Sequence, residues 1–475
     1  MSTPRAGRFL RPLLVLVATL AAAPAARSQG PAGAWQGAIQ GPTGRLDVRV
    51  HLASEAAGWT GTIDIPAQGA FGLALGDVET EGSRVRFAIA GVPGDPHFDG
   101  EQAGDEIVGT FTQRGQRLPF ALRRTVGGAR GRPQDPRAEA PYGSEEVRFR
   151  GDGVELAGTL TLPPGPGPFP AVALLSGSGA QNRDGELMGH RPFLVLADHL
   201  TRRGIAVLRA DDRGVGGSEG NLAQATSSDL AGDALAAVRY LRSRREVAWR
   251  RIGLLGHSEG GLVAPLAASR SSDVRFLVLL AAPGVPGREL LPVQTRRIAL
   301  ATGVPESTVE RQVALLEEGL ALLTSGVGDD EARRGLLDVA RRQLELAGGR
   351  PGDEVTDASI AQEVDLMLTP WFRFFLSHDP REALRRVVVP VLAIQGGLDL
   401  QVDAEQNLPQ VRAALSEGGN RDVTIHRFPG LNHLFQSAGS GAPSEYFQID
   451  ETLAPQVLDL ISRWIVERFG APVGA

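Results

Sequence analysis

The chain has 475 residues, no cysteine, and a formal net charge of −6 at pH 7. A chain without cysteine has no disulfide framework, no thiolate metal site and no cysteine nucleophile. All 49 basic residues are arginines and they form no basic run, which argues against nucleic acid as a partner. A chain of this length can bury a large core without cross-links, and we expect two domains.

Residues 1–28 have the layout of a secretory signal peptide. Three arginines precede an apolar stretch from Leu13 to Ala23, and both Ala23-Pro-Ala25 and Ala26-Arg-Ser28 fit a cleavage site. An uncleaved membrane anchor is the alternative, but the apolar stretch is short for a bilayer span. We therefore expect a secreted or periplasmic protein with no stable membrane insertion after cleavage.

Residues 33–124 show the alternation of β structure. Short alternating runs, such as Leu46–Leu52 and Ile107–Phe111, are separated by glycine-rich turns. This pattern predicts a small antiparallel β barrel or sandwich. Residues 125–143 contain three prolines and no apolar pattern, which is typical of a linker.

The pattern then changes to strands that alternate with helices. Near-continuous apolar runs such as Ala171–Leu175 and Ile252–Leu255 are typical of parallel strands buried on both faces. The alternation predicts an α/β fold with a doubly wound, mostly parallel sheet over residues 144–284 and 386–475. Residues 285–385 hold helical stretches and no strand candidate, so we interpret them as a helical cap inserted over the carboxyl edge of the sheet.

The motif Gly256-His-Ser-Glu-Gly260 matches the G-x-S-x-G nucleophile elbow. A strand pattern leads into it and a helix pattern follows, so we predict that Ser258 is a nucleophile on a tight strand-to-helix turn. The flanking glycines fit because such a turn leaves room only for hydrogen. Gly216-Gly-Ser-Glu-Gly220 matches as well, but no strand directly precedes it and a loop pattern follows. We therefore interpret Ser218 as a turn residue.

A serine nucleophile needs a base and an orienting carboxylate, which in this arrangement follow it in the order acid, then histidine. Asp399 comes directly after an apolar strand and a glycine turn, whereas Asp403 lies nearer the next helix and can equally be its N-terminal cap. His433 falls in the loop after the following strand, Val423–Phe428. We predict Ser258, Asp399 and His433 as a catalytic triad, with Asp403 as the rival to Asp399.

Two backbone amides are expected to hold the oxyanion that such a serine generates. One candidate is the amide of Glu259, directly after the nucleophile. The other is the amide of Ser178, in the loop Ser176-Gly-Ser-Gly179 after an early strand. An ordinary Gly/Ser turn is the alternative for this loop.

The predicted cap contains an aromatic cluster, Trp371-Phe-Arg-Phe-Phe375. Trp371, Phe372 and Phe375 are candidates for an apolar wall that binds substrate, and cap core is the alternative role. No paired metal-ligand spacing occurs in the sequence, so we expect neither a metal nor another cofactor.

With these motifs in place, residues 145–470 resemble the α/β-hydrolase superfamily and, within it, bacterial esterases and hydrolases grouped with serine aminopeptidase S33. Four stretches carry the resemblance: Ser176–Asp184, Asp211–Ser218, Gly256–Gly261 and Gly430–Gln436. The resemblance implies that the D-x-R-G-x-G-x-S run is structural. The family's usual His-Gly in the oxyanion loop is Ser176-Gly177 here. Residues 33–124 resemble, more vaguely, β-barrel domains that precede some such hydrolases.

The predicted triad supports a secreted serine hydrolase that cleaves small carboxylic esters through an acyl-enzyme. Peptide or amide hydrolysis uses the same machinery, so a serine aminopeptidase is the alternative. That activity needs an acidic pocket for a free amine, which Glu259 or a cap carboxylate can supply. A third hypothesis is a ligand-binding protein with an inactive hydrolase domain, and the complete triad argues against it.

Overall fold

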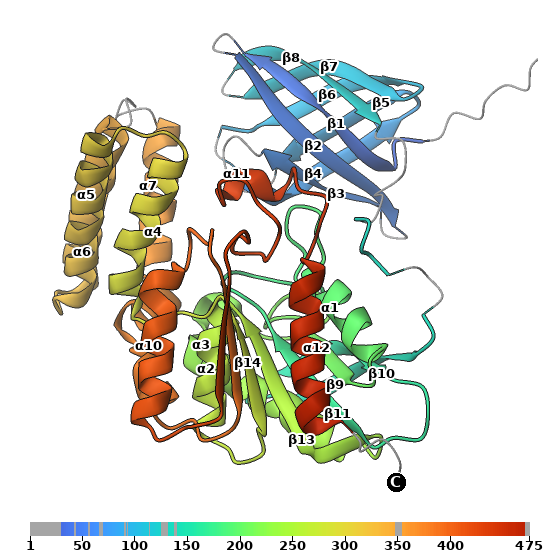
Figure 1. Ribbon diagram of the computed structural model, residues 1–475. Coiled ribbons are helices and arrows are strands. Elements are labelled where there is room, and N and C mark those ends of the chain that lie inside the picture. The colour runs from blue at the N-terminus through green and yellow to red at the C-terminus, as the bar shows by residue number, and fades with distance from the viewer. Residues whose placement is uncertain are drawn as a thin grey trace, which may run out of the picture.

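The computed structural model in Figure 1 describes residues 30–41, 44–55, 58–65, 70–89, 92, 94–113, 115–124, 132–136, 140–346 and 354–470. The predicted signal peptide, residues 1–28, lies outside these ranges, as do residues 125–131 and 137–139 of the predicted linker. Among the described helices, none is both long and apolar enough to cross a membrane.

The N-terminal domain is a closed antiparallel barrel of eight strands, each paired with the next, with β1 also paired to β8. Of the two predicted alternatives, the domain is therefore a barrel and not a sandwich. Its strands are β1 (Gly33–Gly41), β2 (Gly44–Glu55), β3 (Gly58–Ile65), β4 (Ala70–Glu81), β5 (Arg84–Ile89), β6 (His97–Ala103), β7 (Glu106–Gln113) and β8 (Gln116–Arg124).

Side chains that alternate along these strands fill the interior of the barrel. The rings of Phe87, Phe111 and Phe120 surround that of Phe98, with centroids 4.6, 4.8 and 5.0 Å away. An eight-stranded barrel is about wide enough for side chains to fill its interior. The core of this domain is therefore aromatic and aliphatic, and it is separate from that of the rest of the chain.

The larger domain contains an eight-stranded sheet in the order β16-β15-β14-β13-β11-β12-β10-β9. At one edge of the sheet, β9 and β10 are antiparallel to their neighbours, and the other strands pair in parallel. The strands are β9 (Gly143–Arg150), β10 (Glu155–Leu162), β11 (Phe169–Leu175), β12 (Ala206–Ala210), β13 (Val247–His257), β14 (Phe276–Leu280), β15 (Val391–Gly396) and β16 (Val423–Phe428). The predicted doubly wound, mostly parallel sheet is confirmed.

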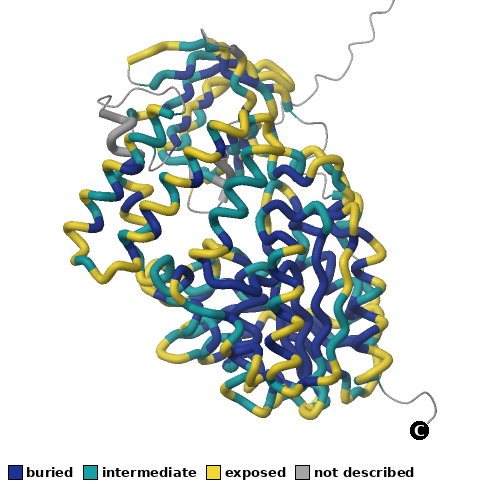
Figure 2. Tube along the Cα trace, turned by 60° about the vertical axis from the view of Figure 1, so that its left-hand side comes forward, coloured by how far each residue is buried: buried dark blue, intermediate teal, exposed yellow. Residues whose placement is uncertain are grey.

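Helices cover both faces of this sheet. One face packs against α1 (Pro192–Thr201) and α12 (Pro455–Phe469). The other packs against α2 (Ser227–Ser243), α3 (Glu259–Ala268) and α10 (Ala404–Glu417). The central strands are consequently buried between two helical layers, as the dark blue core of Figure 2 shows.

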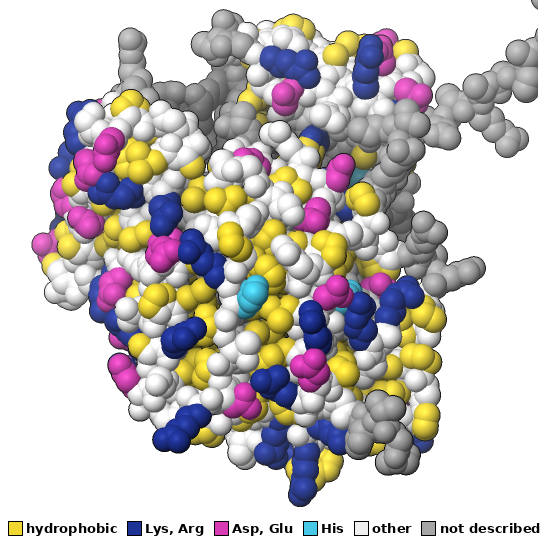
Figure 3. Space-filling view, in the orientation of Figure 1, with side chains coloured by type: hydrophobic (Ala, Val, Ile, Leu, Met, Phe, Trp, Pro, Cys, Tyr) yellow, Lys and Arg dark blue, Asp and Glu magenta, His cyan; other side chains and the backbone are white. Residues whose placement is uncertain are grey.

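Six helices between β14 and β15 form the cap: α4 (Gly287–Ala301), α5 (Glu306–Thr324), α6 (Asp329–Leu346), α7 (Glu354–Met367), α8 (Pro370–Ser377) and α9 (Pro380–Leu384). Figure 1 shows α4 to α7 side by side, beside the upper edge of the sheet. A hydrophobic cluster that includes Leu320, Leu336 and Val364 holds α4 to α8 together, whereas Ala383 and Leu384 of α9 pack in the core of the sheet domain. On the face in Figure 3, acidic and arginine side chains are interspersed over the cap and the sheet domain.

The barrel sits above the carboxyl edge of the sheet, next to the short helix α11 (Pro443–Tyr446) (Figure 1). The guanidinium of Arg49 on β2 lies over the ring of Phe447, and Arg132 of the linker donates to the Phe447 carbonyl at 2.8 Å. The linker side chain of Gln134 exchanges hydrogen bonds with the backbone of Thr452 and Leu453. Barrel and linker are thus both attached to the chain segment that follows α11.

We expect Phe98→Ala to destabilise the barrel by about 3–5 kcal/mol, because it removes a buried ring from the centre of the aromatic cluster. Hydrogen exchange of the β6 and β7 amides measures the change. Val108→Ala is the matched control, since Val108 is 50% exposed on β7. Equal exchange in the two variants would contradict the interpretation of this interior as tightly packed.

Candidate active site

Ser258 lies on a strained turn between β13 and α3. Its backbone has φ 54° and ψ −117°, outside the regions that non-glycine residues usually occupy. A Cβ at Gly256 would lie 2.0 Å from the Gly260 carbonyl oxygen, and one at Gly260 would lie 2.3 Å from the Leu175 carbonyl oxygen. Only glycine fits these positions, so the sequence enforces the tight turn of a nucleophile elbow.

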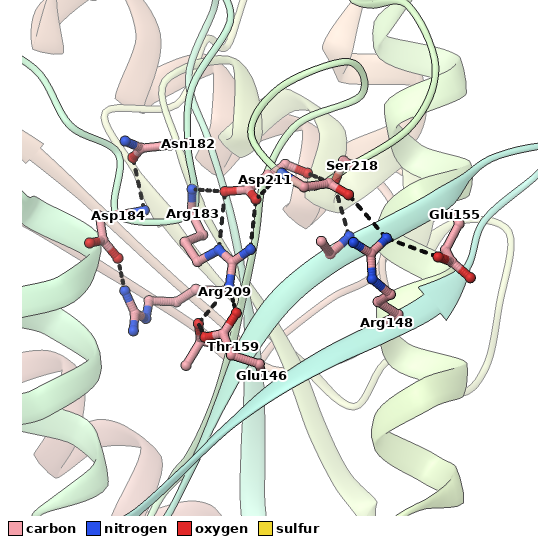
Figure 4. Close-up of polar contacts among 12 residues, drawn as sticks. Glu146, Arg148, Glu155, Thr159, Asn182, Arg183, Asp184, Arg209, Asp211 and Ser218 are labelled. Atoms are coloured by element: carbon pink, nitrogen blue, oxygen red, sulfur yellow. Dashed lines mark hydrogen bonds and ion pairs between the residues drawn. The ribbon is translucent and has the colours of Figure 1, made fainter. Parts of the chain in front are cut away.

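The second G-x-S-x-G serine, Ser218, has a different environment. It is buried, its hydroxyl donates to the Asp211 carbonyl at 2.8 Å, and it accepts from the Ala157 amide at 2.9 Å (Figure 4). The first hydrogen bond closes the turn after β12, and the second holds that turn against β10. Ser218 therefore stabilises this turn.

Asp399 and His433, which follow β15 and β16, come together at the carboxyl edge of the sheet. His433 Nδ1 lies 2.8 Å from Asp399 Oδ2. Because a carboxylate only accepts hydrogen bonds, Nδ1 carries the proton, and Nε2 is left with a lone pair. Both residues are buried, at 1% and 4% exposure, so the pair is shielded from water.

Asp399 accepts three further hydrogen bonds. The backbone amides of Gln401 and Val402 donate to Oδ1 at 2.9 and 2.8 Å, and the Gln395 side chain donates to Oδ2 at 2.9 Å. These donors fix the orientation of the carboxylate. Gln395 was not among the predicted site residues, although a polar residue in the otherwise apolar strand β15 was a signal for it.

Asp403, the rival acid, has a structural position. It is the N-cap of α10, where it accepts from the Gln406 amide at 3.2 Å, and it pairs with Arg297 at 2.7 Å. Asp399 is therefore the carboxylate that contacts His433.

A second histidine, His257, supports the loop of His433 through a hydrogen bond to its backbone. Its Nε2 donates to the His433 carbonyl at 2.9 Å, and the two ring centroids are 4.8 Å apart. Burial, together with the neighbouring His433, lowers the pKa of His257 to about 4. His257 is thus neutral at neutral pH and acts as a fixed donor. Its position next to the nucleophile in the sequence gave no indication of this contact.

The loop after β11 lies against Ser258. A Cβ at Gly177 would be 3.3 Å from Ser258 Cβ, 3.4 Å from Gln181 Nε2 and 3.6 Å from His257 Nδ1. Within the part of the chain that the structure describes, the backbone amides of Ser178 and Glu259 donate to no protein acceptor. Both predicted oxyanion donors are therefore available at this edge of the sheet.

Loop 176–184 is anchored to the turn 211–218, as Figure 4 shows. Arg183 binds the Asp211 carboxylate through its backbone amide at 2.8 Å and its guanidinium at 2.7 and 3.1 Å. Arg209 pairs with Asp184. The turn that contains Ser218 thus supports the loop that contains Ser178.

The aromatic side chains of α8 lie at the junction between the cap and the elbow. The Trp371 indole N–H donates to the Glu259 carboxylate at 2.8 Å, and Ser227 donates to the same oxygen at 2.6 Å. Trp371 also stacks on Phe375, with ring centroids 5.6 Å apart and an interplanar angle of 4°. Phe372 packs against the hydrophobic cluster of the cap.

The described residues contain no group of three or more His, Asp or Glu side chains arranged to hold a metal ion. The polar groups assembled here are a serine, an imidazole with a fixed carboxylate, and two amides. Groups of these kinds serve as nucleophile, base and oxyanion site in enzymes that transfer acyl groups.

Comparison with known proteins identifies relatives. The sequence model of the family described as Serine aminopeptidase, S33, matches residues 191–326. Esterase EstD of Thermotoga maritima is 29% identical over 313 residues, covering 66% of this chain and 66% of that protein. The mitochondrial acyl-coenzyme A thioesterase 2 of Mus musculus is 30% identical over 162 residues, covering 34% of this chain and 32% of that protein. The chain thus spans about two thirds and about one third of their lengths.

Solved structures with similar folds were also found. An esterase from Pyrococcus furiosus is 16% identical with a TM-score of 0.43, covering 70% of this chain and 92% of that chain. A hypothetical protein from Pseudomonas aeruginosa is 16% identical with a TM-score of 0.44, covering 71% of this chain and 97% of that chain.

The sheet order and the glycine-enforced elbow agree with the sequence matches. The chain therefore has the α/β-hydrolase fold, and its sequence is similar to that of an esterase and, over residues 191–326, to the S33 family model.

Proposed function

We propose that this enzyme hydrolyses small carboxylic esters, with Ser258 as nucleophile, His433 as general base and Asp399 as the orienting acid. The observation that carries the proposal is the buried 2.8 Å contact between His433 Nδ1 and Asp399 Oδ2, at the same sheet edge as the strained serine. This contact leaves His433 Nε2 as the nitrogen that takes the proton from the Ser258 hydroxyl.

The reaction has two halves. Ser258 Oγ attacks the ester carbonyl while His433 takes its proton, and the Ser178 and Glu259 amides stabilise the oxyanion. The tetrahedral intermediate collapses, His433 gives its proton to the departing alkoxide, and the acyl-enzyme remains. Water, deprotonated by His433, then attacks the acyl group, and the acid is released as Ser258 recovers its proton.

The environment of Glu259 favours esters over free-amine substrates. An aminopeptidase needs an accessible carboxylate for the substrate ammonium, but Glu259 is 2% exposed and one of its oxygens accepts from both Ser227 and Trp371. The two sequence relatives are named as an esterase and a thioesterase, and both activities cleave an acyl group from oxygen or sulfur rather than from nitrogen. We also propose that residues 1–28 direct export, on their signal-peptide layout.

We expect the mature enzyme to hydrolyse p-nitrophenyl esters, and Ser258→Ala to abolish turnover because it removes the nucleophile. Rates across acyl chains from acetyl to decanoyl then measure the size of the acyl site. Ser218→Ala is the matched control from the second G-x-S-x-G motif, and it should remain active if folded. Cleavage of aminoacyl anilides without any ester cleavage would replace the esterase proposal with an aminopeptidase.

Asp399→Asn should lower kcat by about 10⁴-fold, because the amide can donate to His433 Nδ1 and then favours the wrong tautomer. Steady-state kinetics on the best ester measures the loss. Asp403→Asn is the matched control, since it alters the cap of α10 and leaves the histidine contact intact. A larger kcat loss in the Asp403 variant would assign the acid role to Asp403.

Trp371→Phe should destabilise the protein by about 1–3 kcal/mol, because it removes the indole donor from the buried Glu259 carboxylate. Urea denaturation measures the change in the free energy of unfolding. Trp249→Phe is the control, since Trp249 is 45% exposed. Equal stability of the two variants would show that the Trp371 hydrogen bond contributes little.

A further inference from the structure

The conformation of the oxyanion loop, residues 176–181, depends on side chains outside the catalytic triad. Its conformation sets where the Ser178 amide points, and an oxyanion donor must be placed within a few tenths of an ångström to be effective. The loop contains two glycines, and its residues Ser178 and Gly179 are exposed. Something must therefore hold this loop in the donor conformation.

Asp212 spans the two ends of this loop. The Ser176 hydroxyl donates to Asp212 Oδ1 at 2.6 Å, and the Gln181 amide donates to Oδ2 at 2.9 Å. The Asp212 amide in turn donates to the Gln181 carbonyl at 3.1 Å. One residue thus binds the first and last residues of the loop, and each carboxylate oxygen accepts from one of them.

Within the loop, the Gln181 side chain continues this connection. Its Nε2 donates to the Ser178 carbonyl at 3.2 Å and lies beside Gly177, which faces Ser258. Asp212 therefore fixes the peptide groups around Ser178 from both directions along the chain. It binds Ser176 before them and Gln181 after them.

We propose that Asp212 is a positioning residue whose ionised carboxylate holds the oxyanion loop in its donor conformation. The proposal rests on the proposed function, because it assigns to the loop a role in the same ester hydrolysis. The Ser176 hydroxyl and the Gln181 amide both donate to this carboxylate, and its ionised form can accept both hydrogen bonds. A protonated carboxyl has to give up or reverse one of them.

The surroundings make this carboxylate sensitive to pH. Burial, with smaller contributions from the negative charges of Glu259 and Asp211, raises the pKa of Asp212 to about 7, against the opposing hydrogen bonds from Ser176 and Gln181. The nearby cations are paired elsewhere, since Arg183 binds Asp211 and Arg213 binds Asp233. We call the two hydrogen bonds that the Asp212 carboxylate accepts from Ser176 and Gln181 the clamp. The clamp is therefore intact above about pH 7 and loosens as the pH falls through this value.

The test compares kcat/KM of the wild-type enzyme and Asp212→Asn on p-nitrophenyl acetate, read at the isosbestic wavelength of p-nitrophenol. The asparagine imitates the protonated acid, so we expect a wild-type to variant ratio of about ten near pH 8.5 that falls to about one near pH 5.5. The ratio cancels those effects of pH on the reaction that both enzymes share. A ratio that is constant over this range, at any value, would overturn the proposal.

Two further variants separate the clamp from general stability. Asp233→Asn is the matched control, because Asp233 is a second largely buried carboxylate near Asp212 that binds Arg213 and has no contact with the loop. Its ratio to the wild type should stay near one at pH 8.5, where Asp212 is ionised in both enzymes. Ser176→Ala removes a hydrogen bond that favours ionised Asp212. The pH at which kcat/KM falls as the clamp loosens, the activity step, should therefore be higher in this variant. An unchanged step in this variant would contradict the clamp even if Asp212→Asn did not fold.

Hydrogen exchange separates failure of the clamp from failure of the proposed function. Near pH 8, peptides that cover residues 176–181 should exchange about ten times faster in Asp212→Asn than in the wild type or in Asp233→Asn. This measurement needs no substrate. Faster exchange in an enzyme that cleaves no ester would support the clamp and reject the esterase, whereas unchanged exchange would reject the clamp alone.

Discussion

The strained backbone at Ser258 is the constraint on which the rest of the catalytic domain depends. A serine with φ 54° is held only if β13 and α3 approach so closely that Gly256 and Gly260 are in contact with neighbouring backbone. The parallel strands beside β13 then bring the loops after β11, β15 and β16 to the same edge. The sheet and the turn together gather groups that lie far apart in the sequence.

Carboxylates around this edge differ in role because they differ in donors. Asp399 accepts from an imidazole, an amide side chain and two backbone amides, which suits an orienting anion. Asp403 caps a helix, and Glu259 joins the elbow to the cap through Trp371. Asp212, which binds the two ends of one loop, is the one whose charge state bears on the geometry of that loop. Side-chain type alone does not distinguish these roles.

The order and spacing of strand, glycine and polar residue predicted the fold class, and they predicted that Asp399 and His433 would follow neighbouring strands. These signals are local, because each residue directly follows its own strand. The contact between Trp371 and Glu259 joins residues 112 positions apart, and nothing in either neighbourhood indicates it. The choice between barrel and sandwich likewise depended on the pairing of β1 with β8, since both folds have the same alternation.

The filled interior of the barrel limits how this domain can meet other molecules. Trp35, Phe87, Phe98 and Phe120 are each at most 2% exposed inside it, so the space that larger barrels leave for a guest is taken by the protein's own side chains. A lipocalin-like mode, with a small molecule enclosed by the strands, would require these rings to leave. Any recognition by this domain therefore takes place at its rims or on its outer wall, part of which Arg49, in the middle of β2, already places against Phe447.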